Sequence, residues 1–190
     1  AQLVVHQPLP AGDRVAVVTN SDALSRLIAQ AAASWNLEVT HGPMSLSSEA
    51  SAPEFAKALR AAFEDPKVDS VLTAFIPPIY TDDELVAEAV RDEAARSEKP
   101  CAATFLGMRG VTEALAVSSG EGPKRVVPAY PLPEDAVRAL AAATRYGQWR
   151  ARDHGQVVAP DGVDRDRAAE IIDAVLAEHP DGRSLTFEES

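Results

Sequence analysis

Residues 14–20 read RVAVVTN, and this stretch decides the fold. The run is short, nearly continuously apolar and rich in β-branched residues, so a strand here would be buried on both faces, as strands of parallel sheets are. Asn20, Ser21 and Asp22 end the run. The apolar residues that follow recur at the spacing of an amphipathic helix: Leu24, Leu27, Ile28, Ala31, Ala32 and Trp35. The sequence therefore predicts a strand followed by a helix.

The same alternation continues along the chain. Further strands are predicted at residues 37–40, 68–76 and 100–106, and a fifth at 125–130, which Pro128 places at a sheet edge because proline cannot donate to a ladder. Helices are predicted to begin at Ser51, Thr81 and Pro133, the last of them extending to Trp149. This order indicates an α/β protein with a doubly wound parallel sheet, built as a three-layer α/β/α sandwich with right-handed crossovers.

The sequence also divides the chain. Residues 1–13 are predicted to be an approach segment without a helix, because Pro8 and Pro10 block one and Gly12-Asp13 is typical of a turn. The sheet domain is predicted to span 14–150. Residues 151–190 are predicted to hold a linker and a helix at 165–178. Thr186 and Glu189 have the spacing of a capping box, which predicts that this segment leads into a further domain.

Composition limits the classes of function. The chain has 190 residues, enough for one domain and an appendage, and its 18 basic and 29 acidic residues give a net charge of −11. That charge disfavours non-specific binding to nucleic acid or to anionic membranes. Cys101 is the only cysteine, which excludes an internal disulfide and a thiol-based metal centre. No window approaches the roughly 18 apolar residues of a membrane helix, so we expect a cytoplasmic protein.

The loop after the first strand excludes several common α/β sites. Ligands of open parallel sheets bind at the carboxyl ends of the strands. Residues 19–23 contain no glycine, so this loop is neither a dinucleotide fingerprint nor a phosphate-binding P-loop. It also lacks the small hydroxyl and glycine residues of a flavin phosphate loop. A phospho-acceptor receiver is disfavoured because the third strand ends in Phe75-Ile76-Pro77-Pro78 rather than in an aspartate.

Several stretches, in order, resemble one module of the ADP-forming (NDP-forming) acyl-CoA synthetases, relatives of succinyl-CoA synthetase. They cover roughly residues 12–150: GDRVAVVTNS at 12–21, FAKAL at 55–59 with EDPKVDSVL at 64–72, KPCAA at 99–103, and VPAYPLPEDAVRAL at 127–140. The resemblance implies a flavodoxin-like module that precedes an ATP-grasp region. The ending Tyr146-x-x-Trp149-Arg150 looks most like the branch in which the synthetase-like region is fused to a protein N-acetyltransferase.

The resemblance also implies a mechanism and its partners. Such synthetases form an acyl phosphate, transfer the phosphoryl group to a histidine of another module and pass it to ADP, so the parent is expected to use ATP or ADP, CoA and Mg²⁺. The implied partners are CoA-binding, histidine-bearing and ATP-grasp modules of the same polypeptide. The phosphohistidine would dock at a helix N-terminus. In this chain the first family signature, the phosphate-facing turn, corresponds to Asn20, Ser21, Asp22 and Ala23, where the family has glycines. The second family signature corresponds to Gly42, Pro43 and Met44. We expect no catalytic residue, no metal site and no cofactor bound by this chain alone.

Other polar residues have structural interpretations beside functional ones. His41, expected after the second strand and without a carboxylate partner, is a candidate base but more simply a loop histidine. Asp82, Asp83 and Glu84 suit the start of a helix better than a Mg²⁺ site. Cys101 is expected in the core. Three charged residues, Arg145, Arg150 and Arg152, could meet a nucleotide or a partner domain, or stabilise a helix end.

Three functions stay open at this point. The chain is a structural and phosphohistidine-docking module of an ADP-forming acyl-CoA synthetase, a non-catalytic module of an acetyltransferase fusion that senses CoA or nucleotide, or a free-standing domain for a small anion. The turn without glycine favours the second over the first, and the capping box near the end disfavours the third.

Overall fold

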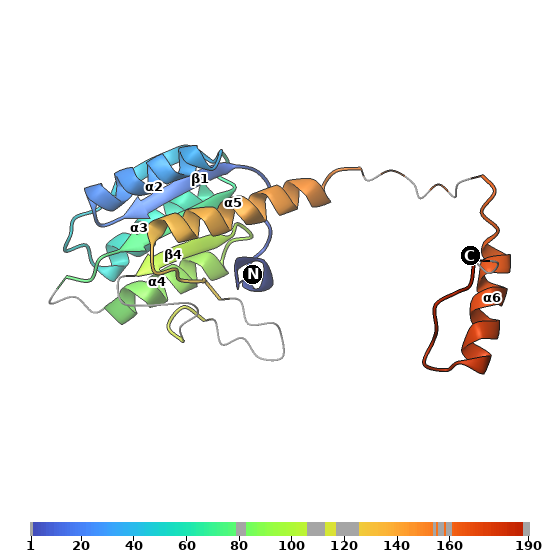
Figure 1. The fold of residues 1–190 in the computed structure, drawn as a ribbon. Helices are drawn as coiled ribbons and strands as arrows, with labels where there is room; N and C mark the ends of the chain where they lie inside the picture. The colour runs from blue at the N-terminus through green and yellow to red at the C-terminus, as the bar shows by residue number, and fades with distance from the viewer. Residues whose placement is uncertain are drawn as a thin grey trace. The chain divides into compact units, whose positions relative to one another are not determined.

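The computed structural model describes residues 2–78, 83–105, 113–116, 126–153, 155, 158 and 161–187. The chain divides into two compact units, Ala1–Arg152 and Asp153–Ser190, and each is described by itself. Figure 1 shows both units, with labels on several of their elements.

The first unit is built on a sheet of four parallel strands: β1 (Arg14–Thr19), β2 (Glu38–Ser45), β3 (Ser70–Phe75) and β4 (Cys101–Phe105). Their order is β2-β1-β3-β4, so the chain reverses direction of winding at β1, as it does in flavodoxin-like sheets. Val15 lies beside Ser70 in the register, and Val71 lies beside Cys101. The prediction of a doubly wound parallel sheet is confirmed.

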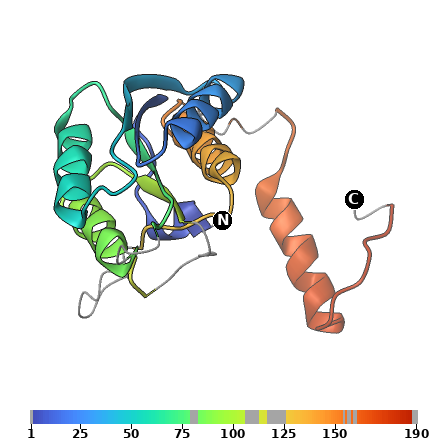
Figure 2. The same cartoon turned by 90° about the vertical axis from the view of Figure 1, so that its left-hand side faces the viewer.

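Helices cover both faces of this sheet. Figure 2 shows α3 (Ala52–Glu64) and α4 (Asp83–Ala95) on one side, with α2 (Asp22–Ser34) and α5 (Pro133–Arg150) on the other. Side chains of β1 alternate between the two layers: Val15 and Val17 join the core with α2 and α5, whereas Ala16 and Val18 join the core with α3. The expectation that residues 14–20 are buried on both faces is therefore confirmed for β1.

The helix that begins after Ser51 illustrates how sequence sets these boundaries. The backbone N–H of Ser51 donates to the carboxylate of Glu54 at 2.8 Å, and Pro53 lies in the first turn, where its missing N–H has no helical partner to lose. The helix ends at Glu64, before Asp65-Pro66, as predicted.

The predicted approach segment contains a helix, and that expectation was wrong. Residues Gln2–His6 form α1, because Pro8 and Pro10 follow the helix rather than interrupt it. Leu3 is buried in the core beside α5, and this burial stabilises a helix too short to form alone.

The predicted fifth strand is also wrong. Among the residues described at 126–130, contacts of strand type reduce to two isolated bridges, Ala129 with Ala103 and Val126 with Ala116. Gln7 lies between β4 and this segment instead: its side chain accepts from the N–H of Cys101 at 3.1 Å and donates to the carbonyl of Val126 at 2.6 Å. The backbone of this segment also pairs with β4 at one point: the N–H of Ala103 donates to the carbonyl of Pro128 at 3.0 Å, and the N–H of Tyr130 donates to the carbonyl of Ala103 at 2.8 Å. The pairing does not continue into a ladder.

The second strand is longer than predicted. It runs from Glu38 to Ser45 rather than over 37–40, and its pairing with β1 shifts register twice. Gly42 has a φ of +93°, and a cis peptide joins it to Pro43. A Cβ at Gly42 would collide with the backbone nitrogen of Met44 and lie 2.8 Å from the carbonyl oxygen of Val17, so glycine is required at this irregularity.

The second unit contains α6 (Arg165–Glu178), which confirms the helix predicted at 165–178. The Asp164 side chain caps it by accepting from the N–H of Arg167 at 2.9 Å. Thr186 is not in a helix, and Glu189 lies outside the described residues, so the expected lead-in to a further domain stays a prediction. In the part of the chain that is described, no helix has the length and apolar character needed to cross a membrane.

Candidate functional site

The turn between β1 and α2 lies at the carboxyl end of the sheet, where the sequence places the candidate site. Asn20 is 3% exposed and its side chain makes three hydrogen bonds. Its oxygen accepts from the N–H of Ile76 at 2.9 Å, and its nitrogen donates to the carbonyls of Ile76 at 2.8 Å and Ser48 at 3.3 Å. Asn20 therefore joins the ends of β1 and β3 to the segment that follows β2.

Hydroxyl groups of this turn are bonded locally as well. The Thr19 hydroxyl donates to the carbonyl of Ser21 at 2.9 Å and lies 3.0 Å from the Ser25 hydroxyl. Ser21 is the N-cap of α2, and its hydroxyl oxygen accepts from the N–H of Leu24 at 3.4 Å. The Ser21 hydroxyl is thus engaged in capping α2, and its role toward an anion stays a prediction.

The remaining two residues of the predicted site, Asp22 and Ala23, form the first turn of α2 and are exposed. A carboxylate at this position stabilises the positive end of the helix dipole. The same charge repels a phosphate that approaches the helix end. Backbone N–H groups are consequently the donors that this turn can offer to an anion.

Gly42, Pro43 and Met44 do not form a loop beside this turn. They lie within β2, and Met44 is the register partner of Val18, one residue before the end of β1. The segment that reaches the turn comes just after them: the N–H of Leu46 donates to the carbonyl of Thr19 at 2.7 Å. Gly42–Met44 therefore lie on the strand beside β1, and Leu46 and Ser48 are the residues of this region that contact the turn.

His41 differs from its sequence-based interpretation in place and in partner. It lies inside β2, opposite Ala16, and its Nδ1 is 2.9 Å from a carboxylate oxygen of Asp65. This hydrogen bond, with a second from the N–H of Lys67, holds the pKa of Asp65 below its ordinary value. The expectation that His41 has no carboxylate partner was wrong. Asp65 ends α3, 24 residues away, and its helix-end position before Pro66 gives no sign of the pairing.

The remaining predicted groups do not assemble a second site. Cys101 is buried in the core, as expected. Asp82 and the side chain of Asp83 lie outside what the structure describes, so the interpretation of Asp82, Asp83 and Glu84 stays a prediction. Within the described ranges, no three His, Cys, Asp or Glu side chains come together in a way that could hold a metal ion.

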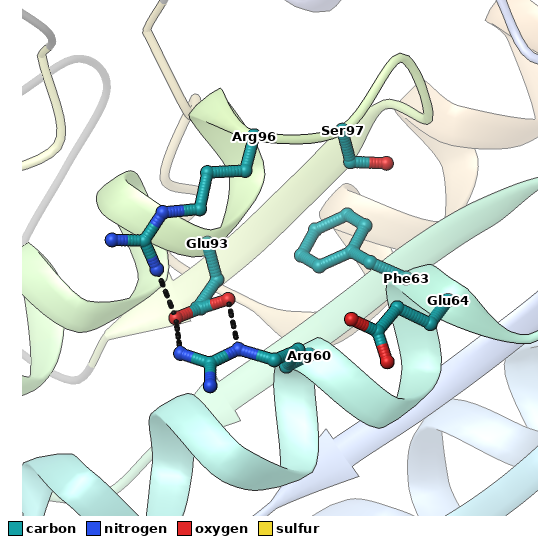
Figure 3. Close-up of a pocket in the computed structure, with 6 residues that line it drawn as sticks. All are labelled: Arg60, Phe63, Glu64, Glu93, Arg96 and Ser97. Atoms are coloured by element: carbon teal, nitrogen blue, oxygen red, sulfur yellow. Dashed lines mark hydrogen bonds and ion pairs between the residues drawn. The ribbon is translucent and has the colours of Figure 1, made fainter.

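A small cavity of about 140 Å³ lies between α3 and α4, and sequence reasoning missed the ion pairs beside it. Figure 3 shows Arg60 and Arg96 side by side on the carboxylate of Glu93. Arg60 reaches it through Nε at 3.1 Å and Nη2 at 2.6 Å, and Arg96 through Nη1 at 2.7 Å. The Glu93 side chain is 5% exposed. Glu64 also lines the cavity, so its two arginines and two glutamates sum to no net charge. The hydrogen bonds between Arg60 and Glu93 join the two helices.

Comparisons with known proteins bear on the whole of this arrangement. No family model matches the chain. It is 25% identical over 173 residues to the alpha subunit of acetate–CoA ligase [ADP-forming] I of Pyrococcus furiosus, an alignment that covers 80% of the chain and 37% of that protein. It is 23% identical over 192 residues to the ADP-forming 4-hydroxybutyrate–CoA ligase of Nitrosopumilus maritimus, covering 90% of the chain and 27% of that protein. Over most of its length the chain is therefore similar to ADP-forming acyl-CoA ligases.

Solved structures agree with this relationship at the level of the fold. PH0766 of Pyrococcus horikoshii superimposes with a TM-score of 0.64 at 20% identity, over 77% of the chain and 38% of that protein. The dinucleotide-forming acetyl-coenzyme A synthetase 1 of Candidatus Korarchaeum cryptofilum, solved with phosphate and ADP, gives 0.60 at 20% identity, over 78% and 37%. The resemblance to ADP-forming acyl-CoA ligases predicted from the sequence is confirmed, and the chain spans less than two fifths of each of these relatives.

Proposed function

We propose that this relative of the ADP-forming acyl-CoA ligases is one structural module of a larger synthetase-like protein and holds no complete active site of its own. The ligase relatives support this proposal, because they match most of this chain while the chain spans 37% and 27% of their lengths. CoA, the nucleotide and Mg²⁺ would then be held by CoA-binding, histidine-bearing and ATP-grasp modules of the same polypeptide.

The hydrogen bonds of Asn20 carry the proposal. The Asn20 side chain is hydrogen-bonded to Ile76 and Ser48, and the Ser21 hydroxyl caps α2. Both side chains therefore have structural partners within the fold. These neutral side chains of the turn are therefore already engaged and are not offered to a nucleotide or to CoA. What the turn can present is the pair of backbone N–H groups at Asp22 and Ala23, at the positive end of α2.

The docking role follows from those two N–H groups. We propose that the start of α2 receives the phosphorylated histidine segment of another module through backbone hydrogen bonds, as helix N-termini bind anions in general. No bond to this chain forms or breaks in such a step. The module holds the phosphoryl group in place while the groups that react with it belong to other modules.

Two substitutions at Asp22 test the docking role in the full-length polypeptide. Asp22→Ala removes the charge and keeps the N–H. Asp22→Pro removes both, and proline is well tolerated there because Asp22 is the first helical residue and Ser21 before it has an extended backbone. We expect Asp22→Ala to support phosphohistidine formation from ATP at least as fast as the unmodified protein. We expect Asp22→Pro to be slower than Asp22→Ala by about tenfold, the loss of one charge-assisted hydrogen bond. Equal rates for the two variants would contradict docking at α2.

A second candidate is favoured by one observation, the exposed carboxylate of Asp22 at the place where a phosphate would dock. In that case the chain is a non-catalytic regulatory or scaffold module of an acetyltransferase fusion that senses CoA or nucleotide. This candidate predicts that neither Asp22 variant changes the rate of phosphoryl transfer. It also predicts an acetyltransferase domain in the same polypeptide, which reading the flanking sequence decides.

A further inference from the structure

A groove lies at the amino-terminal ends of the strands, where β1 and β2 begin, and thus at the other end of the sheet from the turn after β1. It has a volume of about 300 Å³ and runs between the last turn of α2 and the last turns of α5. Its floor is apolar, formed by Leu37 and Ala141, which are 5% and 1% exposed. Gly147 permits α5 to come this close to the chain before β1, since a Cβ there would lie 2.9 Å from the carbonyl oxygen of Pro10.

One wall of the groove is an indole covered by a guanidinium. Trp35 ends α2 and is 38% exposed, and the Cζ atom of Arg145 lies 5.5 Å from the centre of its ring. A cation at this distance is attracted by the negative face of the ring. The pair presents flat surfaces to the solvent at a place where a planar group can extend the stack.

The charge around the groove differs from that of the rest of the chain. Residues 139–152 carry three arginines and no acidic residue, in a protein with a net charge of −11. Arg14 and Arg60 are each paired with a buried carboxylate. In the described part of the chain no carboxylate pairs with Arg145 or Arg152, and both line the groove. The one acidic residue in the lining is Asp13, so the groove keeps a positive charge.

Two side-chain amides complete the lining, those of Asn36 and Gln148. Each offers donors and an acceptor, the combination that matches the edge of a heterocyclic base. The negative ends of α2 and α5 favour cations in this region and account for the arginines. They do not account for the exposed indole or for the hollow beside it.

We propose that this groove binds a small ligand in which a planar heterocycle is joined to an anionic group, the chemistry of a mononucleotide. The heterocycle stacks on the Trp35–Arg145 pair, and Arg152 together with the outer N–H groups of Arg145 binds the anion. The volume is near the lower end for small-molecule clefts, which suits one base and one phosphate rather than a larger ligand. The site does not depend on the proposed function, because it lies at the amino-terminal ends of the strands, away from the turn after β1, and needs no further module.

Tryptophan fluorescence gives a direct test, since Trp35 and Trp149 are the two tryptophans of the chain. The Trp149→Phe variant leaves Trp35 as the single reporter, and AMP, adenosine and inorganic phosphate are titrated into it separately. We expect saturable quenching by AMP, with adenosine and phosphate each at least about tenfold weaker, because each lacks half of the recognised chemistry.

Charge-matched variants in the same background locate the binding. Arg145→Gln and Arg152→Gln are each expected to weaken AMP binding at least about tenfold. Arg26→Gln makes the same change of charge on the first half of α2, outside the groove, and is expected to leave AMP binding unchanged. Circular dichroism shows whether each variant is folded. Absence of saturation with AMP, equal binding of phosphate alone, unchanged binding in both groove variants, or an equal loss in Arg26→Gln would each overturn the proposal.

Discussion

Three polar side chains at single positions join parts of the first unit that are far apart in the sequence. Gln7 reaches Val126, Asn20 reaches Ile76, and Asp69 binds Arg14 through both carboxylate oxygens. Each of the three is less than 8% exposed. A buried polar group is costly when its partner is lost, so these positions should be among the most sensitive in the unit.

We expect Gln7→Leu to lower the free energy of unfolding by about 3 kcal/mol, because the N–H of Cys101 and the carbonyl of Val126 would both stay buried without a partner. Urea unfolding measures the change. Gln30→Leu, an equivalent substitution at an exposed position of α2, serves as the control and should change the same quantity by less than about 0.5 kcal/mol. Similar losses in the two variants would show that Gln7 does not bridge β4 and the following segment.

Asp69 predicts a dependence of stability on pH. Its hydrogen bonds with Arg14 hold the pKa of the carboxyl below its ordinary value of 3.8. A carboxyl whose pKa is lowered by folding stabilises the folded state above its unfolded pKa, and this stabilisation is lost as the pH falls through the folded value. We therefore expect Asp69→Asn to be less stable than the unmodified protein at pH 7, and the difference to narrow below about pH 4. Urea unfolding at a series of pH values measures it, and a difference that stays constant down to pH 2 would contradict this assignment.

Sequence reasoning at single positions identified local roles and missed distant ones. Ser51 and Pro133 were recognisable as helix starts because the residues that they serve follow directly in the sequence. The partners of His41 and Gln7 lie 24, 94 and 119 residues away, and no local pattern connects them. Asn20 follows the first strand, as the sequence predicts, but its three hydrogen bonds depend on how β1, β2 and β3 come together.

At the level of elements, the pairing of α3 with α4 makes the clearest prediction. Arg60 joins the two helices through two hydrogen bonds to the buried carboxylate of Glu93, whereas Arg96 binds the same carboxylate from the residue directly after α4. We expect Arg60→Ala to lower the free energy of unfolding more than Arg96→Ala, because Arg60 makes two hydrogen bonds between the helices whereas Arg96 makes a single i,i+3 pair. Urea unfolding of the two variants decides the matter, and an equal cost for both would mean that Glu93 does not hold the helices together.

The spacing of apolar residues predicted most helices and strands, because the burial of one or both faces of an element determines where its apolar residues recur. The starts of α3 and α5 follow from Ser51 and from Pro133, which cap or initiate helices locally. The missed element, α1, has only five residues and depends on the burial of Leu3. Residues 126–130 have the composition of a strand, but Pro128 cannot donate and Gln7 takes the adjacent partner.

For the whole molecule, the proposed modular role predicts inactivity in isolation. We expect the purified 190-residue chain to form no acyl-CoA from an organic acid, CoA and ATP, because the groups that react would belong to other modules. A coupled assay for ADP release measures this, with the full-length polypeptide as the positive control. Turnover by the isolated chain would contradict the proposal, and it would require catalytic residues in this chain itself.

The irregular second strand has a consequence for how the molecule behaves at high concentration. An open sheet with straight edges is a template on which strands of other molecules can add, which is how fibrillar aggregates grow. Here the β2 edge carries Pro43, which has no N–H, and a left-handed Gly42, both within the second of the two register shifts. At the β4 edge, the backbone is already bonded to Gln7 and to Tyr130. Both edges of the described sheet are therefore poor templates for the addition of a further strand, which opposes the growth of fibrils from the folded molecule.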